Sequence, residues 1–324
     1  MRILVTGCCG FIGHRTTEML LEKGSAVFGI DNLNDYYDVR LKNYRLKRLK
    51  RWNDFRFKKI DFLNRISIDK LFEENDFAAV IHLGGMAGVR QSVKDPHIYV
   101  QANVLGTLNI LEGMRVSGVK KLVTASTSSL YAGQELPFSE VNDTSLPISP
   151  YAASKKAAEV MSYTYHYLHQ IDVSILRYFT VYGPAGRPDM SYFRFIKSID
   201  EGFPIVLYGD GSQGRDFTYV DDVALGTILA LKKIGYEIIN LGGSNNPVAI
   251  NYLIAKTEEY LGKRAKIIRK PIDKADIPNT QADITKAKKL LGWSPKVTFD
   301  EGLKMTLEWY KENRRWLKSI KLAE

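Results

Sequence analysis

Three polar side chains, Thr127, Tyr151 and Lys155, have the types and spacing of a proton-transfer site. Tyr151 and Lys155 belong to the segment Y-A-A-S-K, and Thr127 follows the apolar residues 121–125. A tyrosine hydroxyl has an ordinary pKa of about 10, so it accepts a proton at neutral pH only where its phenolate is stabilised. Positions i and i+4 share one face of a helix, so we expect the Lys155 ammonium to lower the pKa of Tyr151. The set predicts a base that deprotonates an alcohol, although a surface tyrosine packed on a lysine stem has the same spacing.

A glycine-rich turn near the N-terminus predicts a dinucleotide that would accept a hydride from the same alcohol. Residues 2–6 form a β-type run, and residues 16–23 are predicted to be a helix with Met19 and Leu20 facing inward. A strand, a glycine turn and a helix N-terminus together bind a pyrophosphate through backbone N–H groups and the helix dipole. The residues expected to bind the cofactor, in G-x-x-G-x-x-G spacing, are Gly7, Gly10, Phe11, Ile12 and Gly13.

Asp31 predicts which nicotinamide cofactor is used. It ends the predicted strand 26–30, where a carboxylate can accept both hydroxyls of the adenosine ribose and repel a 2′-phosphate. We therefore expect NAD rather than NADP. The alternative is an ordinary aspartate at a strand end, beside a turn that needs glycine only for its shape.

Alternating strand and helix patterns run through most of the chain and predict an α/β fold, a doubly wound parallel sheet of the Rossmann type. A loop-rich segment follows residue 180, and we expect a smaller mixed α/β domain to cover the carboxyl ends of the strands. The predicted division is 1–180 plus 214–244 for the NAD domain, and 181–213 plus 245–324 for the substrate domain. The further strands are 55–61, 78–84, 121–125, 173–179 and 237–241, with helices at 67–74, 99–116 and 151–169.

Composition excludes several classes of protein. The 324 residues are 45% hydrophobic, enough for a large core, yet no apolar run approaches the roughly 20 residues of a membrane span. The N-terminus reads as a strand, so we expect a cytoplasmic protein. Cys8 and Cys9 are the only cysteines and are adjacent in the glycine turn, so neither a structural disulfide nor a metal site is expected.

The net charge of +10 is concentrated in one segment. Residues 40–59 contain ten lysines and arginines and a single acidic residue, Asp54. Such a run could bind nucleic acid through phosphates. Leu41, Tyr44 and Leu49 recur at helical spacing among the charges, which favours a helix with one packed face and one solvated basic face.

Nearly the whole chain resembles the extended short-chain dehydrogenase/reductase family of nucleotide-sugar enzymes, and within it most closely the UDP-glucuronate 4-epimerases. The segments that carry the resemblance are 31–38 (DNLNDYYD), 82–90 (HLGGMAGVR), 177–184 (RYFTVYGP), 186–190 (GRPDM) and 215–222 (RDFTYVDD). The resemblance implies NAD contacts from Asn32, from Asp61 and Phe62 beside the adenine, from Leu83, Gly84 and Gly85 at the riboses, from Asn103 near the catalytic helix, from Tyr178 near the nicotinamide, and from Tyr151 and Lys155. It implies UDP-sugar contacts from Arg90, Ser128, Ser129, Thr180, Arg187, Tyr208 and Arg215.

The chain departs from the family pattern at two places. Gly84-Gly85-Met86 stands where members commonly have Ala-Ala-Gln, which leaves the detail of the NAD contact open. Thr180 stands where many nucleotide-sugar enzymes have asparagine, and the glucuronate epimerases tend to share this threonine.

The segment Thr127-Ser128-Ser129 indicates the reaction. Dehydratases of the family resemble Thr-Asp-Glu here and UDP-glucuronate decarboxylases Thr-Ser-Glu, so the lack of an acid favours simple return of the hydride after the 4-keto sugar turns over. Hydroxyls of Ser128, Ser129 and Thr180 and the Arg187 guanidinium are expected around the substrate carboxylate. The alternative for Arg187 is a loop ion pair with Asp189.

Other functions stay open at this point. A UDP-galactose or UDP-N-acetylglucosamine 4-epimerase would act on neutral sugars, and a UDP-glucuronate decarboxylase would release CO₂. A non-catalytic NAD-binding regulator would need the glycine turn but not the tyrosine base, and a nucleic-acid binder would use residues 40–59. The resemblance also implies a homodimer formed through helices 99–116 and 151–169.

Overall fold

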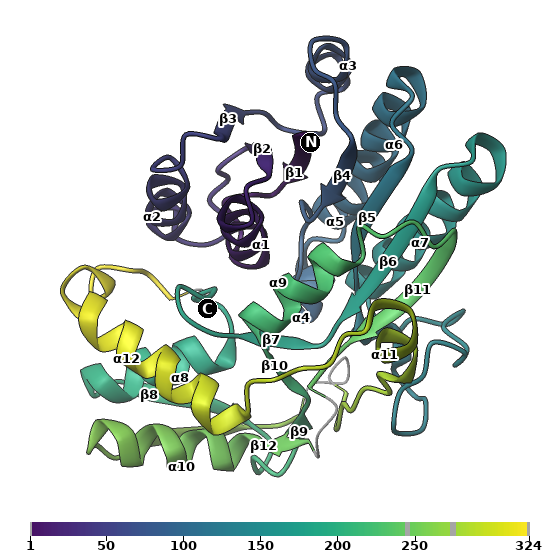
Figure 1. The fold of residues 1–324 in the computed structure, drawn as a ribbon. Coiled ribbons are helices and arrows are strands. Elements are labelled where there is room, and N and C mark those ends of the chain that lie inside the picture. Colours follow the sequence, from purple (N-terminus) through teal and green to yellow (C-terminus); the bar gives the residue numbers. More distant parts are fainter. Residues whose placement is uncertain (1, 244–246, 273–276, 323–324) are drawn as a thin grey trace.

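The computed structural model describes residues 2–243, 247–272 and 277–322, and its centre is a seven-stranded parallel sheet (Figure 1). Every strand pairs in parallel with its neighbours. This confirms the predicted doubly wound α/β fold. The strand order is β11 (Tyr236–Leu241), β6 (Asp172–Tyr178), β5 (Lys121–Thr127), β4 (Ala79–His82), β1 (Arg2–Thr6), β2 (Ala26–Asp31) and β3 (Phe55–Lys59).

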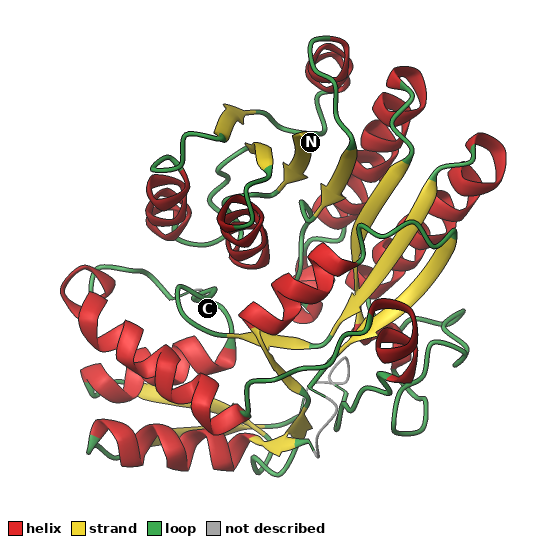
Figure 2. Cartoon of the chain, viewed as in Figure 1, coloured by secondary structure: helices red, strands yellow, loops and turns green. Residues whose placement is uncertain are grey.

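Helices cover both faces of the sheet because side chains alternate along each strand. In β1, Ile3 and Val5 face a core shared with α1 and α9, whereas Leu4 faces a core shared with α3 and α6. Figure 2 shows these helices on the two sides of the strands. The helices that flank the sheet are α1 (Phe11–Glu22), α2 (Val39–Leu49), α3 (Arg65–Glu73), α4 (Val89–Lys94), α5 (His97–Tyr99), α6 (Gly106–Ser117), α7 (Pro150–His169), α9 (Val220–Leu229) and α11 (Thr285–Leu291).

Several element boundaries differ from the prediction. Helix α1 begins at Phe11, five residues earlier than expected, because the glycine turn leads directly into its first turn. Met19 is only half-buried, and Leu20 with Leu21 forms the inward face instead. The predicted helix 99–116 is broken into α5, a π-helical turn over Val100–Leu105, and α6. A π-helical turn changes the helical phase, which hydrophobic spacing alone does not reveal.

The basic segment folds as predicted into a helix, α2, with Leu41, Leu46 and Leu49 buried. The expectation that its cations are all solvated is wrong for Lys42 and Arg45, which are also buried. The Arg45 guanidinium donates hydrogen bonds to the carbonyls of Cys9, Ala185 and Gly186 and to the Tyr37 hydroxyl. It therefore links the glycine turn to the 184–187 loop.

The remaining elements gather around a separate hydrophobic cluster that includes Tyr182, Tyr192, Leu253, Leu307 and Tyr310. Figure 1 shows helices α8, α10 and α12 side by side at the lower left, beside the sheet. Three two-stranded sheets accompany them. These elements are β7 (Thr180–Tyr182), α8 (Ser191–Glu201), β8 (Pro204–Tyr208), β9 (Gly214–Arg215), β10 (Phe217–Tyr219), β12 (Val248–Ala249), α10 (Ile250–Leu261), β13 (Lys266–Lys270) and α12 (Phe299–Leu317).

None of the helices in 2–243, 247–272 and 277–322 combines the length and apolar character needed to cross a bilayer. Over the same ranges, no group of three or more histidine, cysteine, aspartate or glutamate side chains is arranged to hold a metal ion.

Candidate active site

A cavity of about 730 Å³ opens at the carboxyl ends of the parallel strands. Residues that end or follow β1, β2, β3, β4, β5 and β6 line it, together with the first turns of α1 and α7. In doubly wound folds this edge of the sheet is where ligands bind. The cavity therefore lies where the predicted cofactor and substrate residues should meet.

The glycine turn forms one wall of the cavity, and its three glycine positions leave no room for a side chain. A Cβ atom on Gly13 would lie 2.1 Å from the Gly7 carbonyl oxygen, and one on Gly7 would lie 2.8 Å from the Cα atom of Gly84. Gly7 also has a positive φ of 67°. Helix α1 begins directly after Gly10, and its first residues line the cavity. The first N–H groups of a helix have no partner within it, so this end of α1 can bind a diphosphate.

Asp31, Asn32 and Asp61 lie together on the cavity wall. The Asp31 carboxylate accepts hydrogen bonds from the backbone N–H groups of Cys9 (3.1 Å) and Leu33 (2.8 Å). The Asn32 amide donates to Asp61 at 3.0 Å. These contacts hold the carboxylates at the end of β2 where an adenosine ribose would lie. Lys42, which the sequence analysis did not assign to the site, also lines this wall.

The departure from the family pattern at residues 84–86 has a packing explanation. A Cβ atom on Gly84 would lie 2.6 Å from the Phe62 ring, and one on Gly85 would lie 2.7 Å from the Asn103 side-chain oxygen. Phe62, Leu83, Gly84 and Gly85 all line the cavity. Glycine at 84 thus accommodates the large Phe62 ring, so the two positions are coupled.

Strand β5 and helix α7 bring Thr127, Tyr151 and Lys155 to one wall of the cavity. Thr127 is the last residue of β5. Ser149 caps α7 by accepting a hydrogen bond from the N–H of Ala152 at 3.2 Å, which places Tyr151 in the first turn and Lys155 one turn later. The Tyr151 ring packs edge-on against the Tyr99 ring, with centroids 6.0 Å apart.

Burial dominates the electrostatics of this wall. Burial raises the pKa of Tyr151, opposed by a hydrogen bond with Thr127 and by the charge of Arg187. The Lys155 ammonium donates to the Ala125 carbonyl at 3.1 Å. Burial lowers the pKa of Lys155 to about 8, and the Glu159 carboxylate opposes that shift. The groups that oppose the effect of burial on the pKa of Tyr151 are thus Thr127 and Arg187.

Asn103 lies behind the cavity rather than on its wall. Its amide bridges the backbone N–H and carbonyl of Met86 at 2.9 and 3.0 Å and donates to the Ser154 hydroxyl at 2.9 Å. The residue joins the 84–86 loop to helix α7 from the π-helical turn. Tyr178, the remaining predicted cofactor residue, lines the cavity at the end of β6.

Four of the predicted substrate residues, Ser128, Ser129, Thr180 and Arg187, lie on the cavity wall. Arg187 is paired with Asp189 through two hydrogen bonds of 3.0 and 2.5 Å and also donates to the Ala87 carbonyl at 3.1 Å. The structure thus contains the loop ion pair considered as the alternative for Arg187. The pair is itself part of the wall, because Asp189 also lines the cavity.

Three other predicted substrate residues, Arg90, Tyr208 and Arg215, are not among the residues that line the cavity in the described part of the chain. The Arg90 guanidinium stacks 3.8 Å from the centre of the Tyr208 ring. Arg215 donates hydrogen bonds of 2.9 Å to the carbonyls of Gly214 and Pro278. The structure brings Arg90 and Tyr208 together, but away from the tyrosine base.

The sequence analysis missed Tyr36 as a residue of the cavity wall. Its hydroxyl donates to the Ala87 carbonyl at 2.8 Å and lies 3.0 Å from the Tyr99 hydroxyl. Tyr36 belongs to the 31–38 segment that carried the family resemblance, but Tyr36 itself was not predicted to line the cavity. Nothing in the local sequence indicates that it meets Ala87 and Tyr99.

Comparison with known proteins identifies the family. Residues 4–306 match the family model described as GDP-mannose 4,6 dehydratase. A UDP-glucuronate 4-epimerase of Thermodesulfobacterium geofontis is 57% identical over 319 residues, which cover 98% of this chain and 99% of that protein.

Solved structures agree with this match. A UDP-glucuronic acid 4-epimerase from Bacillus cereus, in complex with UDP-glucuronic acid and NAD, aligns with a TM-score of 0.91 and 37% identity over 97% of this chain and all of that one. A UDP-glucose 4-epimerase from Thermotoga maritima, with UDP-glucose, aligns with a TM-score of 0.87 and 32% identity over 97% of this chain and all of that one. With a family match and relatives that span nearly its whole length, the chain belongs to the GDP-mannose 4,6 dehydratase-like family of extended short-chain dehydrogenases/reductases.

Proposed function

We propose that the protein is an NAD-dependent 4-epimerase that interconverts UDP-glucuronate and UDP-galacturonate through a 4-keto intermediate. The observation that carries the proposal is the convergence of Thr127, Tyr151 and Lys155 with the glycine turn on one cavity. The relative with 57% identity and the structural neighbour solved with UDP-glucuronic acid and NAD support the same reaction.

The residues of the cavity fit NAD. The glycine turn would hold its diphosphate, and Asp31, Asn32 and Asp61 its adenosine. When bound, NAD supplies a reversible hydride acceptor. Because each turnover returns the hydride, the scheme never requires release of the cofactor, so we expect the protein to retain it.

Tyr151 is the proposed base for the sugar 4-hydroxyl, with Thr127 hydrogen-bonded to it and Lys155 one helical turn away. Tyr151 takes the proton when the sugar is oxidised and returns it when the 4-keto sugar is reduced on its other face. Ser128 and Ser129 stand where an acid would be needed to eliminate water. The sugar therefore turns over and is reduced.

The substrate carboxylate must be restrained during this step because a 4-keto uronic acid is a β-keto acid and loses CO₂ readily. We propose that the hydroxyls of Ser128, Ser129 and Thr180 bind the carboxylate both before and after the sugar ring rotates. We also propose that the Arg187 guanidinium stays paired with the carboxylate during the rotation. Arg187 would then exchange part of its pairing with Asp189 for the substrate.

We also propose a homodimer formed through α6 and α7. These helices pack side by side, and α7 exposes the apolar residues Val160, Tyr167 and Leu168. The π-helical turn before α6 exposes Val100 and Leu105. An apolar surface of this kind favours association, and a molar mass measured by light scattering at micromolar concentration tests it.

The division into an NAD domain, 1–180 plus 214–244, and a nucleotide-sugar domain, 181–213 plus 245–324, is likewise a proposal. The hydrophobic cluster around Tyr182 and Tyr310 supports it, because most of its residues come from 181–213 and 245–324, although Tyr37, Leu41, Phe217 and Tyr219 of the NAD domain also join it. Limited proteolysis that cuts near these boundaries would test it. A cytoplasmic location stays a prediction.

The decisive experiment is to incubate the purified protein with UDP-glucuronate and follow the sugar signals by NMR. UDP-galacturonate is the expected product. A UDP-pentose with release of CO₂ would instead indicate a decarboxylase. A parallel incubation with UDP-glucose tests the neutral-sugar epimerase that the Thermotoga maritima structure represents.

A further inference from the structure

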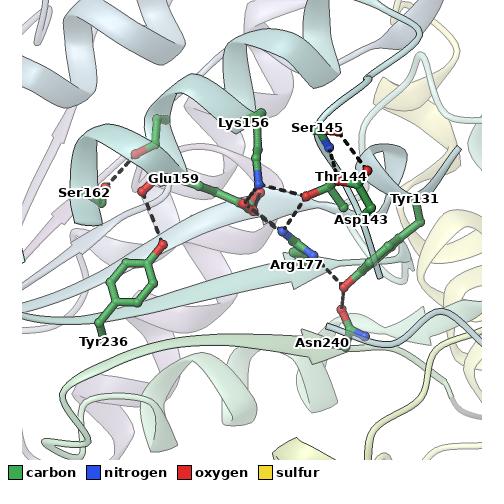
Figure 3. Close-up of polar contacts among 12 residues, drawn as sticks. Tyr131, Asp143, Thr144, Ser145, Lys156, Glu159, Ser162, Arg177, Tyr236 and Asn240 are labelled. Atoms are coloured by element: carbon green, nitrogen blue, oxygen red, sulfur yellow. Dashed lines mark hydrogen bonds and ion pairs between the residues drawn. The ribbon is translucent and has the colours of Figure 1, made fainter. Parts of the chain in front are cut away.

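Glu159 is a buried carboxylate that lies one helical turn beyond Lys155 on α7. It accepts a hydrogen bond from the Ser126 hydroxyl at 2.6 Å. It also forms a two-pronged pair with Arg177, with nitrogen–oxygen distances of 2.9 and 2.8 Å (Figure 3). Both side chains of the pair are almost completely inaccessible to solvent.

The position of this pair relative to the reacting groups is specific. Ser126 and Arg177 are register partners on β5 and β6, and the next partners along the same strands are Thr127 and Tyr178. Glu159 therefore connects α7, the helix that carries Tyr151 and Lys155, to both strands. The connection lies one residue before Thr127 on β5 and one residue before Tyr178 on β6. A change in this connection would move the helix relative to the strand ends.

Arg177 is itself fixed from the other side. It donates to the Tyr131 hydroxyl at 2.9 Å and to the Thr144 hydroxyl at 3.3 Å, and Tyr131 in turn donates to Asn240 at 2.7 Å (Figure 3). A buried ion pair of this kind often gives no more stability than apolar residues of the same size. Its presence beside the catalytic helix therefore calls for a role other than stability.

The titratable groups that face Glu159 come from four elements. Lys155 and Lys156 share α7 with it, Arg177 comes from β6, and Tyr236 of β11 donates to the Glu159 backbone carbonyl at 3.4 Å. Tyr131 follows β5 and reaches Glu159 through Arg177. Lys156 is 3.8 Å from Glu159 and also bonds the Thr144 hydroxyl, toward the outside of the helix. Lys155 is thus the group through which the charge of Glu159 reaches the cavity.

We propose that Glu159 is a positioning residue of the epimerase: its bonds to Ser126 and Arg177 hold α7 against Thr127 and Tyr178, and its carboxylate, one turn beyond Lys155, compensates the charge of that buried ammonium. The proposal rests on the proposed function and adds a residue that touches neither substrate nor cofactor. Arg177 sets how much of the negative charge Lys155 experiences. The direction in which Glu159 shifts the pKa of Lys155, opposite to burial, agrees with this role.

The test compares pH–rate profiles of three variants with wild type. In Glu159→Gln, loss of the negative charge leaves Arg177 uncompensated, so the alkaline limb should move to lower pH by about one unit. In Arg177→Met, Glu159 is uncompensated and the limb should move to higher pH. In the double variant both charges are absent, and the limb should return toward its wild-type position.

Asp172→Asn is the matched control. Asp172 pairs with Lys121 at 2.5 Å, and the two are register partners at the opposite end of β5 and β6. Removing that buried pair should leave the pH profile where it was. If the Glu159 and Arg177 variants lose activity equally at every pH, with no shift of the limb, the pair is only structural and the proposal is wrong. The double variant and Arg177→Met keep the test open if Glu159→Gln does not fold.

A second readout does not depend on the substrate. The titration of the Lys155 side chain can be followed by NMR on protein with labelled lysine, and its signal is identified by its absence in Lys155→Met. This titration should shift to lower pH in Glu159→Gln and to higher pH in Arg177→Met. If wild type does not epimerise UDP-glucuronate while these shifts appear, the proposed function fails and the role of Glu159 stands. Unshifted titrations would overturn the role of Glu159.

Discussion

The two sides of the cavity are built differently. On the cofactor side, backbone groups and close glycine contacts shape the wall, as at Gly7 and Gly13. On the substrate side, side chains shape the wall: the hydroxyls of Ser128, Ser129 and Thr180, and the ion pair of Arg187 with Asp189. A backbone-built wall tolerates almost no substitution, whereas a side-chain wall can exchange partners. An enzyme that retains its cofactor but rotates its 4-keto sugar within the site needs this difference.

The largest expected effect is that of Tyr151→Phe, which sharpens the comparison because it separates chemistry from binding. Removing the hydroxyl should reduce turnover of UDP-glucuronate by about 10²- to 10⁴-fold. The NAD content of the purified protein should stay near wild type, since the ring still packs on Tyr99. Near-native activity would show that Tyr151 is not the base, and lost NAD would show that the two sides are not separable.

Gly13→Ala tests whether the cofactor side of the cavity tolerates as little substitution as its backbone contacts indicate. The new Cβ atom would meet the Gly7 carbonyl oxygen, an obstacle that no side-chain rotation removes. Overpacking of about 1–3 kcal/mol corresponds to roughly 5- to 150-fold weaker NAD binding, measurable by calorimetry on the cofactor-free protein.

Gly84→Ala provides the control for this prediction. There the obstacle is the Phe62 ring, a side chain, so Gly84→Ala combined with Phe62→Leu should bind NAD about as well as Phe62→Leu alone. Recovery by a side-chain change is not expected for Gly13→Ala. If Gly13→Ala bound NAD normally, the contrast between the two walls would not hold.

Arg187→Ala tests the substrate side. Loss of hydrogen bonds to a charged group costs about 1.5–3 kcal/mol, so kcat/KM for UDP-glucuronate should fall roughly 10- to 150-fold. Activity on a neutral UDP-sugar should change far less. Arg90→Ala is the comparison, because Arg90 stacks on Tyr208 and is not among the lining residues of the cavity in the described part of the chain, so its loss should affect both substrates alike. Equal losses in Arg187→Ala would mean that this arginine does not read the carboxylate.

The smallest effect concerns pH. Burial lowers the pKa of Lys155 to about 8, so its ammonium is protonated below that pH and loses its proton above it. We therefore expect kcat/KM to fall as the pH rises through about 8, approaching a tenfold loss per unit. A profile flat to pH 10 would contradict the assignment of a low pKa to Lys155. Such a result would also weaken the case for Glu159.

Local sequence was enough to predict the strand-turn-helix at Gly7 to Gly13, the strand-end aspartate Asp31, and the set Thr127, Tyr151 and Lys155. Each of these depends on residues close together in the chain, through helical or strand periodicity and glycine spacing. The predicted helix 99–116 is helical throughout, but its π-helical turn was not predicted, because such a turn changes the helical phase without changing hydrophobic composition.

Long-range contacts account for what the sequence did not reveal. The chemical character of Arg45, a cation in a basic run, indicated a solvated side chain, yet the fold buries it beneath the carbonyls of Cys9 and Ala185. Asn103 similarly acts through Met86 and Ser154. The pair of Arg187 with Asp189 was foreseen as an alternative, but the bond from Arg187 to the Ala87 carbonyl depends on the fold.

The sequence by itself thus determined the fold class, the glycine turn, and the strand end and helix that carry Thr127, Tyr151 and Lys155, since short-range backbone geometry specifies each of them. Tertiary structure decided which charges are buried, which are paired and how the pKa values of Tyr151 and Lys155 shift. Those properties depend on desolvation and on partners such as Glu159 and Arg177, whose strands and helix become neighbours only when the sheet forms.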